Sequence, residues 1–175
     1  MRLKEKQFVP FIVGVALLSV IVIVFSSFRF KQKQERMFAE NLQKSKLLQS
    51  TMMYKVGSPD SLTLSSLKGK NALLVFWASW SDKSELMLNE IDLLASERDS
   101  LVVLAGLVKD AEESFSSVKK YKGFVYVDGT YLFNELKVPG IPSYVLFNKD
   151  GTVMHSNIGY QKGVGYDTLK ARLNE

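Results

Sequence analysis

The chain has 175 residues, 46% of them hydrophobic, and carries a formal net charge of +5, so it can form one domain core of ordinary size plus an appendage. It contains no cysteine, which excludes disulfide and thiol chemistry by this chain alone. Residues 1–51 hold 9 of the 23 Lys and Arg residues against 3 acidic ones, and because the rest is nearly neutral, a nucleic-acid partner is not expected.

An uncharged run of 21 residues, 8–28, follows a short N-terminal tail at 1–7. As a helix it would measure roughly 31 Å at a rise of about 1.5 Å per residue, which matches the hydrocarbon core of a bilayer. A cleavable signal peptide is the alternative, but its apolar region spans only about 7 to 15 residues and ends at small residues. Here the run passes directly into Arg29. The pattern therefore favours an uncleaved transmembrane anchor.

Residues 29–53 form a basic segment that we expect to be a juxtamembrane stalk. Phe38, Leu42 and Leu47 recur at loosely helical intervals, so the segment is either a solvated tether or an amphipathic helix that binds a partner. Its cations would favour anionic lipid headgroups. More Lys and Arg residues follow the apolar run than precede it, and this count by itself favours a cytoplasmic C-terminal domain.

Residues 54–175 have the pattern of an α/β domain. Residues 72–77 (ALLVFW) are a continuous apolar run, which is typical of a strand buried on both faces. Residues 148–151 (NKDG) predict a hairpin turn. The expected strands are 62–64, 72–77, 101–108, 124–127, 143–147 and 152–158, and the expected helices are 82–96, 111–121, 130–136 and 166–173. This order predicts a mixed sheet covered by helices on both faces.

Four segments of this domain resemble the membrane-tethered thioredoxin-like proteins of the TlpA and ResA type, within the redoxin group. They are GSPDSLTLSSLKGK at 57–70, LLVFWASWSDKS at 73–84, VPGIPSYVLFNKDG at 138–151, and the Ile158-Gly159 pair. The resemblance implies a thioredoxin-like fold. It also implies a cis peptide bond at Pro142, which would place the backbone of Ile141 against the loop that holds Ser81.

Ser81 and Ser84 stand where active members of this family carry their two redox cysteines. A serine hydroxyl neither ionises appreciably near neutral pH nor forms a reversible sulfur–sulfur bond, so dithiol exchange by this chain alone is excluded. Such relatives often carry an acidic residue and a proline shortly after the second cysteine, where this chain has Met87 and Asn89. This wider departure favours natural degeneration; the alternative is an active enzyme whose cysteines were replaced by serine.

The resemblance favours a redox-inactive protein that binds a peptide or serves as a scaffold subunit in the cell envelope. With serines at both cysteine positions no catalytic residue is expected, and because the sequence has no Cys/His cluster and no phosphate-binding motif, no metal and no cofactor are expected. The resemblance implies a binding surface that consists of Trp80, Ser81, Asp82, Ile141 and Pro142. One alternative is an oxidoreductase homologue whose activity depends on a partner's cysteines, and another is a purely structural domain. A serine nucleophile is not favoured, because nothing in the sequence brings the sole histidine, His155, to Ser81.

The expected partners are the bilayer and a protein or peptide of the envelope. The resemblance implies that the domain faces the periplasm or the cell exterior, which opposes the charge count around the apolar run.

Overall fold

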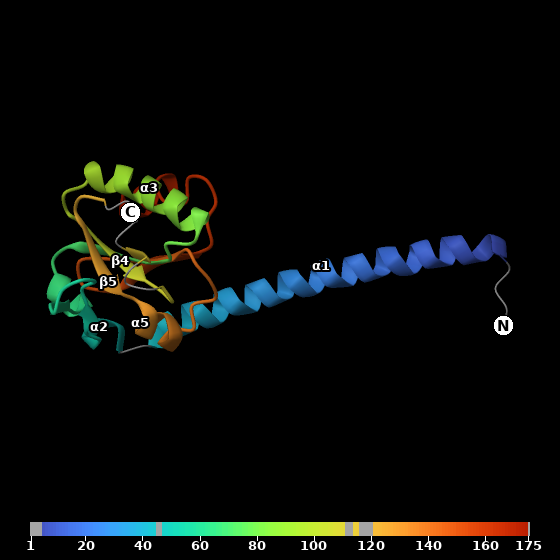
Figure 1. Ribbon diagram of the computed structural model, residues 1–175, viewed down its shortest axis with the longest axis horizontal. Coiled ribbons are helices and arrows are strands. Elements are labelled where there is room, and N and C mark those ends of the chain that lie inside the picture. Colours follow the sequence, from blue (N-terminus) through green and yellow to red (C-terminus); the bar gives the residue numbers. More distant parts are fainter. Residues whose placement is uncertain (1–4, 45–46, 111–113, 116–120, 175) are drawn as a thin grey trace. The chain divides into compact units, whose positions relative to one another are not determined.

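The computed structural model describes residues 5–44, 47–110, 114–115 and 121–174 (Figure 1). They belong to two units, residues 1–37 and residues 38–175, which are described separately. Most of the helix expected at 111–121 lies outside the described residues. Within that helix, Ser114 and Phe115 are helical, and the ring of Phe115 contacts the ring of Trp77 at 6.4 Å between centroids.

The first unit consists of the described N-terminal part of α1 (Glu5–Lys44), which contains the apolar run. From Phe8 to Phe30, the large apolar side chains on this helix are between 49% and 66% exposed. A helix that is apolar on every side and uncovered by protein is suited to lipid rather than to water. This part of α1 is long and apolar enough to cross a membrane.

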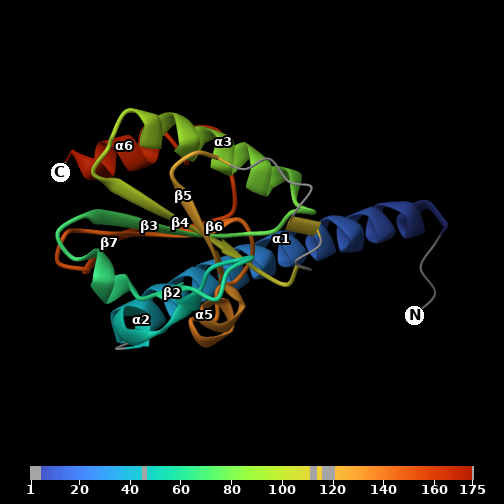
Figure 2. The same cartoon turned by 60° about the vertical axis from the view of Figure 1, so that its left-hand side comes forward.

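The second unit is a five-stranded mixed sheet in the order β5-β4-β3-β6-β7, with helices on both faces (Figure 2). The strands are β3 (Asn71–Trp77), β4 (Leu101–Leu107), β5 (Phe124–Asp128), β6 (Ser143–Phe147) and β7 (Val153–Ile158). The helices α3 (Asp82–Ser96) and α6 (Asp167–Leu173) cover one face, and α2 (Leu47–Ser50) and α5 (Thr130–Glu135) lie on the other. The fold predicted from the sequence is confirmed.

The central strand β3 separates two hydrophobic cores. Because successive side chains of a strand point to opposite faces, Leu73, Val75 and Trp77 enter the core beneath α3 and α6. Leu74 and Phe76 enter the core on the opposite face. All five side chains are at most 1% exposed, which explains why this segment reads as one uninterrupted apolar run.

The domain begins inside the segment that we expected to be a stalk. Phe38 and Leu42, on the last turns of α1, are 1% and 4% exposed and belong to the second core together with Leu48 and Met53. The side-chain amide of Asn41 also donates to the backbone oxygen of Leu136 at 3.1 Å. The apolar stripe at the end of α1 is therefore covered by the domain itself, rather than by solvent or by a separate partner.

The entrance to the domain also differs from the expected strand at 62–64. The structure has a two-stranded sheet of β1 (Met53–Tyr54) and β2 (Ser61–Leu62), followed by a 3₁₀ helix, η1 (Leu64–Leu67). Residues three apart in a 3₁₀ helix lie on the same side, so Leu64 and Leu67 both reach the second core. The expected strand therefore ends at Leu62, and Leu64 enters the core from the 3₁₀ turn instead.

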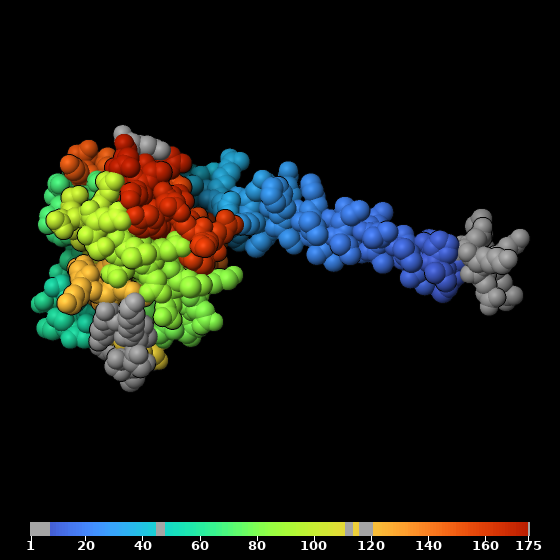
Figure 3. Space-filling view, turned by 90° about the horizontal axis from the view of Figure 1, so that it is seen from above, coloured from blue at the N-terminus to red at the C-terminus, as the bar shows by residue number. Residues whose placement is uncertain are grey.

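A carboxylate on α3 holds the C-terminal segment in place. Glu90 accepts hydrogen bonds from the Tyr160 hydroxyl at 2.9 Å and from the backbone N–H groups of Gly163 and Gly165, both at 2.8 Å. A Cβ at Gly165 would lie 2.9 Å from the Cβ of Glu90 and from the backbone oxygen of Met87, so a side chain does not fit there. Figure 3 shows α3 and the C-terminal segment side by side on the surface of the domain.

Candidate functional site

The candidate site begins where β3 ends and α3 starts. Ser81 is the N-cap of α3, and its side-chain oxygen accepts a hydrogen bond from the backbone N–H of Ser84 at 3.3 Å. Serine is among the preferred residues at this position, because its oxygen satisfies one of the free N–H groups of the first turn. The positive end of the helix dipole therefore lies at residue 81, where a thiolate would be stabilised if a cysteine were present.

Ser84 has a structural position rather than a reactive one. Its side chain is fully buried, and its hydroxyl oxygen accepts a hydrogen bond from the backbone N–H of Ala78 at 3.4 Å. The two serines therefore connect the first turn of α3 with the loop that precedes it. Their described hydrogen bonds are those of a helix cap and a loop brace, and neither contact activates a nucleophile.

The loop before β6 reaches the same edge of the sheet. The antiparallel register pairs Phe76 with Ser143, so the residues that follow β3 run alongside those that precede β6. The Ile141–Pro142 peptide bond is cis. Two hydrogen bonds fix this loop: the Ser143 hydroxyl donates to the Gly140 oxygen at 2.6 Å, and the Gly159 N–H donates to the Pro142 oxygen at 2.8 Å.

The residues expected to form a binding surface differ in their exposure. Trp80 is 66% exposed, and Asp82 is also exposed, whereas Ser81 and Ile141 are half-buried. Pro142 is buried, so its ring offers no free surface. The β3–β6 register brings both loops to one edge, where Trp80 presents the largest free apolar side chain among these five. An exposed indole is a frequent anchor in protein interfaces.

The group that handles protons in active relatives is replaced by core structure. Met87 is completely buried in the core beneath α3. The side-chain oxygen of Asn89 accepts a hydrogen bond from the Tyr121 hydroxyl at 2.9 Å. Burial raises the pKa of Tyr121 to about 12, so this hydroxyl stays protonated near neutral pH and acts as a donor. Neither position can act as a general base for a thiol.

Asp110 supports the site and was missed in the sequence analysis. Its carboxylate accepts a hydrogen bond from the backbone N–H of Ser79 at 2.6 Å, which fixes the loop immediately before Trp80. A charge-assisted bond of this kind is stronger than a neutral one. The sequence did carry a signal for this contact. Parallel neighbouring strands end at the same edge of a sheet, so an acidic residue three positions after β4 could be expected near the loop that follows β3.

The structure does not bring the histidine to the serines. His155 lies on β7 opposite Leu146, and its ring is 5.8 Å from the ring of Tyr144. Leu146 is three residues along β6 from Ser143, which corresponds to about 10 Å of strand. Among the described residues, no group of three or more His, Asp or Glu side chains could hold a metal ion. The arrangement can donate and accept hydrogen bonds and offer apolar contact.

Comparison with known proteins identifies the fold. No protein-family model matches the chain. A secreted disulfide oxidoreductase of Mycobacterium tuberculosis, described as homologous to Escherichia coli DsbE, is similar over 74% of this chain and 98% of its own, with a TM-score of 0.63 and 19% identity. The exposed lipoprotein thioredoxin Etrx1 of Streptococcus pneumoniae is similar over 71% of this chain and 98% of its own, with a TM-score of 0.58 and 22% identity.

StoA of Bacillus subtilis is a third similar structure, with a TM-score of 0.55 and 20% identity over 70% of this chain and 95% of its own. At these identities the likeness establishes the fold. The chain combines this fold with an N-terminal helix that could span a membrane and with a complete absence of cysteine. The C-terminal domain is therefore a cysteine-free domain with the thioredoxin-like fold.

Proposed function

We propose that this chain is a membrane-anchored, redox-inactive protein that binds an extended polypeptide of the cell envelope. The binding surface is formed by the two loops at the carboxyl end of β3, with Trp80, Ser81, Asp82 and Ile141 accessible to a partner. The buried Pro142 contributes only through its cis peptide bond, which fixes the backbone of Ile141. An extended peptide can pair with a free backbone segment through main-chain hydrogen bonds, and this requires no sulfur. The backbone of Ile141 would supply that segment.

The exposure of Trp80 beside the cis-proline loop is the observation that carries this proposal. Leaving a tryptophan 66% exposed offers no core packing to the domain, whereas burying it against a partner removes a large apolar area from water. The loop that carries Trp80 is also braced by the hydrogen bond from the Ser79 N–H to the Asp110 carboxylate. A rigid anchor loses little conformational freedom on binding, which favours affinity.

The anchor and the side of the membrane are part of the proposal. The similarity of the fold to a secreted oxidoreductase and to an exposed lipoprotein supports a domain outside the cytoplasm. A reporter enzyme that is active only outside the cytoplasm, fused after Glu175, is expected to be active in intact cells. If only a reporter that works in the cytoplasm is active at the same position, the domain faces the cytoplasm and the proposed orientation is wrong.

The surface is tested by recovering partners of the full chain from solubilised envelope membranes. Trp80→Ala and Ile141→Asp are expected to lose the same partner, with recovery reduced about tenfold or more if the indole is a binding hot spot. Leu93→Ala is the matched control, because Leu93 is a similarly exposed apolar residue at the other end of α3. Thermal unfolding of each variant separates loss of binding from loss of the fold.

Unchanged recovery with both variants would discard this surface and favour a purely structural domain. The oxidoreductase alternative is tested separately, by adding purified envelope partners to the chain in a disulfide-reduction assay. Turnover that disappears in Ser81→Ala would overturn the redox-inactive role.

A further inference from the structure

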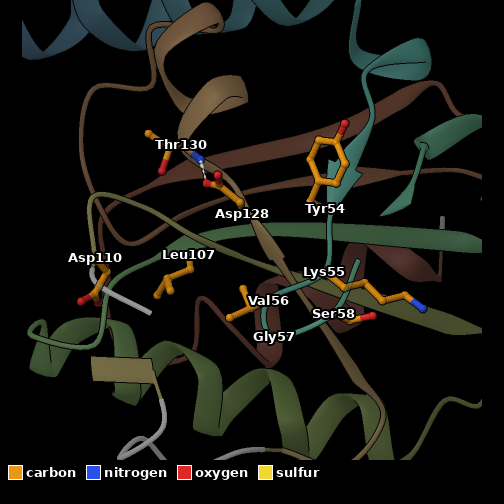
Figure 4. Close-up of a pocket in the computed structure, with 9 residues that line it drawn as sticks. All are labelled: Tyr54, Lys55, Val56, Gly57, Ser58, Leu107, Asp110, Asp128 and Thr130. Atoms are coloured by element: carbon orange, nitrogen blue, oxygen red, sulfur yellow. Dashed lines mark hydrogen bonds between the residues drawn. The ribbon is translucent and has the colours of Figure 1, made fainter. Parts of the chain in front are cut away.

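We propose that a pocket beside the candidate site binds a single cationic group, a guanidinium or an ammonium. This inference is independent of the peptide-binding function. The pocket has a volume of about 320 Å³, which lies at the lower end of the range for small-ligand sites. Figure 4 shows the residues that line it: Tyr54, Lys55, Val56, Gly57, Ser58, Leu107, Asp110, Asp128 and Thr130.

The register of the strands places an aromatic ring beside a carboxylate in this pocket. The antiparallel bridge between Lys55 and Val127 puts Tyr54 next to Asp128 across the edge of the sheet. Asp128 is also paired with Leu107 on the other side, so these three residues come from adjacent segments at one end of the sheet. Tyr54 is 58% exposed, and its ring can contact a cation through its face.

The charge of the lining favours a cation over an anion. Asp110 and Asp128 contribute two carboxylates, and Lys55 is the single cation among the lining residues. The ammonium group of Lys55 is held by the carboxylate of Asp60 at 3.2 Å, which offsets its charge. The lining of the pocket therefore has a net negative charge beside the face of an aromatic ring. This is the combination that recognises guanidinium and ammonium groups.

Both carboxylates are positioned in advance by backbone hydrogen bonds. Asp110 accepts from the N–H of Ser79 at 2.6 Å. Asp128 accepts from the N–H of Thr130 at 2.8 Å, the bond that is dashed in Figure 4. Each of these bonds uses one of the two oxygens, and a carboxylate can accept about four hydrogen bonds. An arginine fork could therefore be bound without breaking the bonds that hold the site.

The test uses the full chain in nanodiscs of zwitterionic lipid, with ligand-observed saturation-transfer NMR, which detects weak binding. N-acetyl-arginine amide is the cationic probe, and N-acetyl-citrulline amide is a neutral probe of nearly the same shape. We expect saturable binding of the arginine probe that weakens several-fold when salt rises from 0.05 to 0.5 M, on the order expected for a partly exposed charge pair. Empty nanodiscs measure binding to lipid.

The double variant Asp110→Asn with Asp128→Asn keeps an acceptor oxygen for each backbone bond and removes both charges. This double variant is expected to bind the arginine probe with an affinity about fivefold lower, or lower still. Asp99→Asn is the matched control, since Asp99 is an exposed carboxylate just before the opposite end of β4, and it should leave binding unchanged. If the double variant loses its fold, Tyr54→Leu replaces it, with an expected weakening of about twofold or more.

Equal binding of the arginine and citrulline probes, or an unchanged affinity in the variants, would overturn the cation site. A pentapeptide, acetyl-Gly-Gly-Arg-Gly-Gly-amide, identifies the source of the cation. Tighter binding of this peptide than of the single-residue probe, with the gain lost in Trp80→Ala, assigns the cation to a bound polypeptide. Equal affinity for the peptide and the probe assigns it to a free small molecule. The probe-binding test does not depend on the partner-recovery experiment. If Trp80→Ala leaves partner recovery unchanged, the proposed peptide-binding surface is wrong, but the cation site is still tested by the arginine and citrulline probes.

Discussion

Glu90→Ala is expected to lower the free energy of unfolding of the domain by about 3 kcal/mol. The substitution removes the acceptor of three hydrogen bonds and leaves the backbone N–H groups of Gly163 and Gly165 without it. Each charge-assisted bond contributes roughly 1.5 to 3 kcal/mol, and a buried donor left unsatisfied costs about 1 to 3 kcal/mol. Glu90, Tyr160 and Gly163 are half-buried and Gly165 is buried, so water can replace part of the lost bonding. We therefore expect each of the three bonds to cost only about 1 kcal/mol, which gives about 3 kcal/mol in all. Urea unfolding of the full chain in detergent, followed by tryptophan fluorescence, measures it.

Two variants separate the contribution of Glu90 from a general effect of its helix. Glu85→Ala removes an exposed carboxylate from the first turn of α3 and is expected to cost only about 0.5 kcal/mol through the helix dipole. Glu90→Gln keeps the shape of the side chain but offers one acceptor oxygen in place of two. Its loss of unfolding free energy should therefore lie between those of Glu85→Ala and Glu90→Ala. A loss below about 1 kcal/mol for Glu90→Ala would show that the C-terminal segment is held by its apolar contacts alone.

The double variant Ser81→Cys with Ser84→Cys is expected to form an intrachain disulfide when treated with an added oxidant such as diamide. Residue 81 caps α3, and its oxygen already contacts the backbone N–H of residue 84 at 3.3 Å. The helix N-terminus should lower the pKa of the thiol at position 81 below its ordinary value of about 8.5, because the positive end of the helix dipole stabilises the thiolate. The rate of alkylation as a function of pH measures this pKa in the single variant Ser81→Cys.

The unsubstituted chain is the control for this experiment and is expected to show no disulfide-reductase turnover. The introduced cysteine pair should give measurable but slow turnover, because Met87 is buried where the active thioredoxin-like proteins that the sequence resembles carry an acid. Introducing Met87→Glu beside the cysteine pair should raise the rate of turnover, and thermal unfolding checks that this variant is folded. A cysteine pair that stays reduced under oxidant would show that the loop does not have the geometry of a redox site.

The sheet could be predicted because its strands carry strong local signals. Residues of β3 and β4 are buried on both faces and read as continuous apolar runs, and Asn148 and Gly151 mark the turn between β6 and β7. The sequence also offers a cap for α3 at Ser81 or Asp82, since a polar residue there precedes a run of residues at helical spacing, and the structure uses Ser81. Local patterns of this kind depend on neighbours in the sequence.

The features that were missed depend on contacts between distant residues. The spacing of Phe38 and Leu42 indicates a helix with one apolar face but does not say what covers that face. Glu90 and Asp110 look like ordinary surface carboxylates until the fold brings them to Gly163 and Ser79. The surface at Trp80 and Ile141 was placed through resemblance to a family, and its role stays a prediction.

The burial of Phe38 and Leu42 sets the shortest C-terminal fragment that keeps the domain intact. A protease or an expression boundary placed before Phe38 leaves the second core complete. A cut between Leu42 and Leu48 removes two buried apolar side chains, those of Phe38 and Leu42, from that core, and each large side chain lost from a packed core costs about 2 to 5 kcal/mol. Cleavage before residue 38 is therefore the cut that should leave the core of the domain complete and the fragment stably folded.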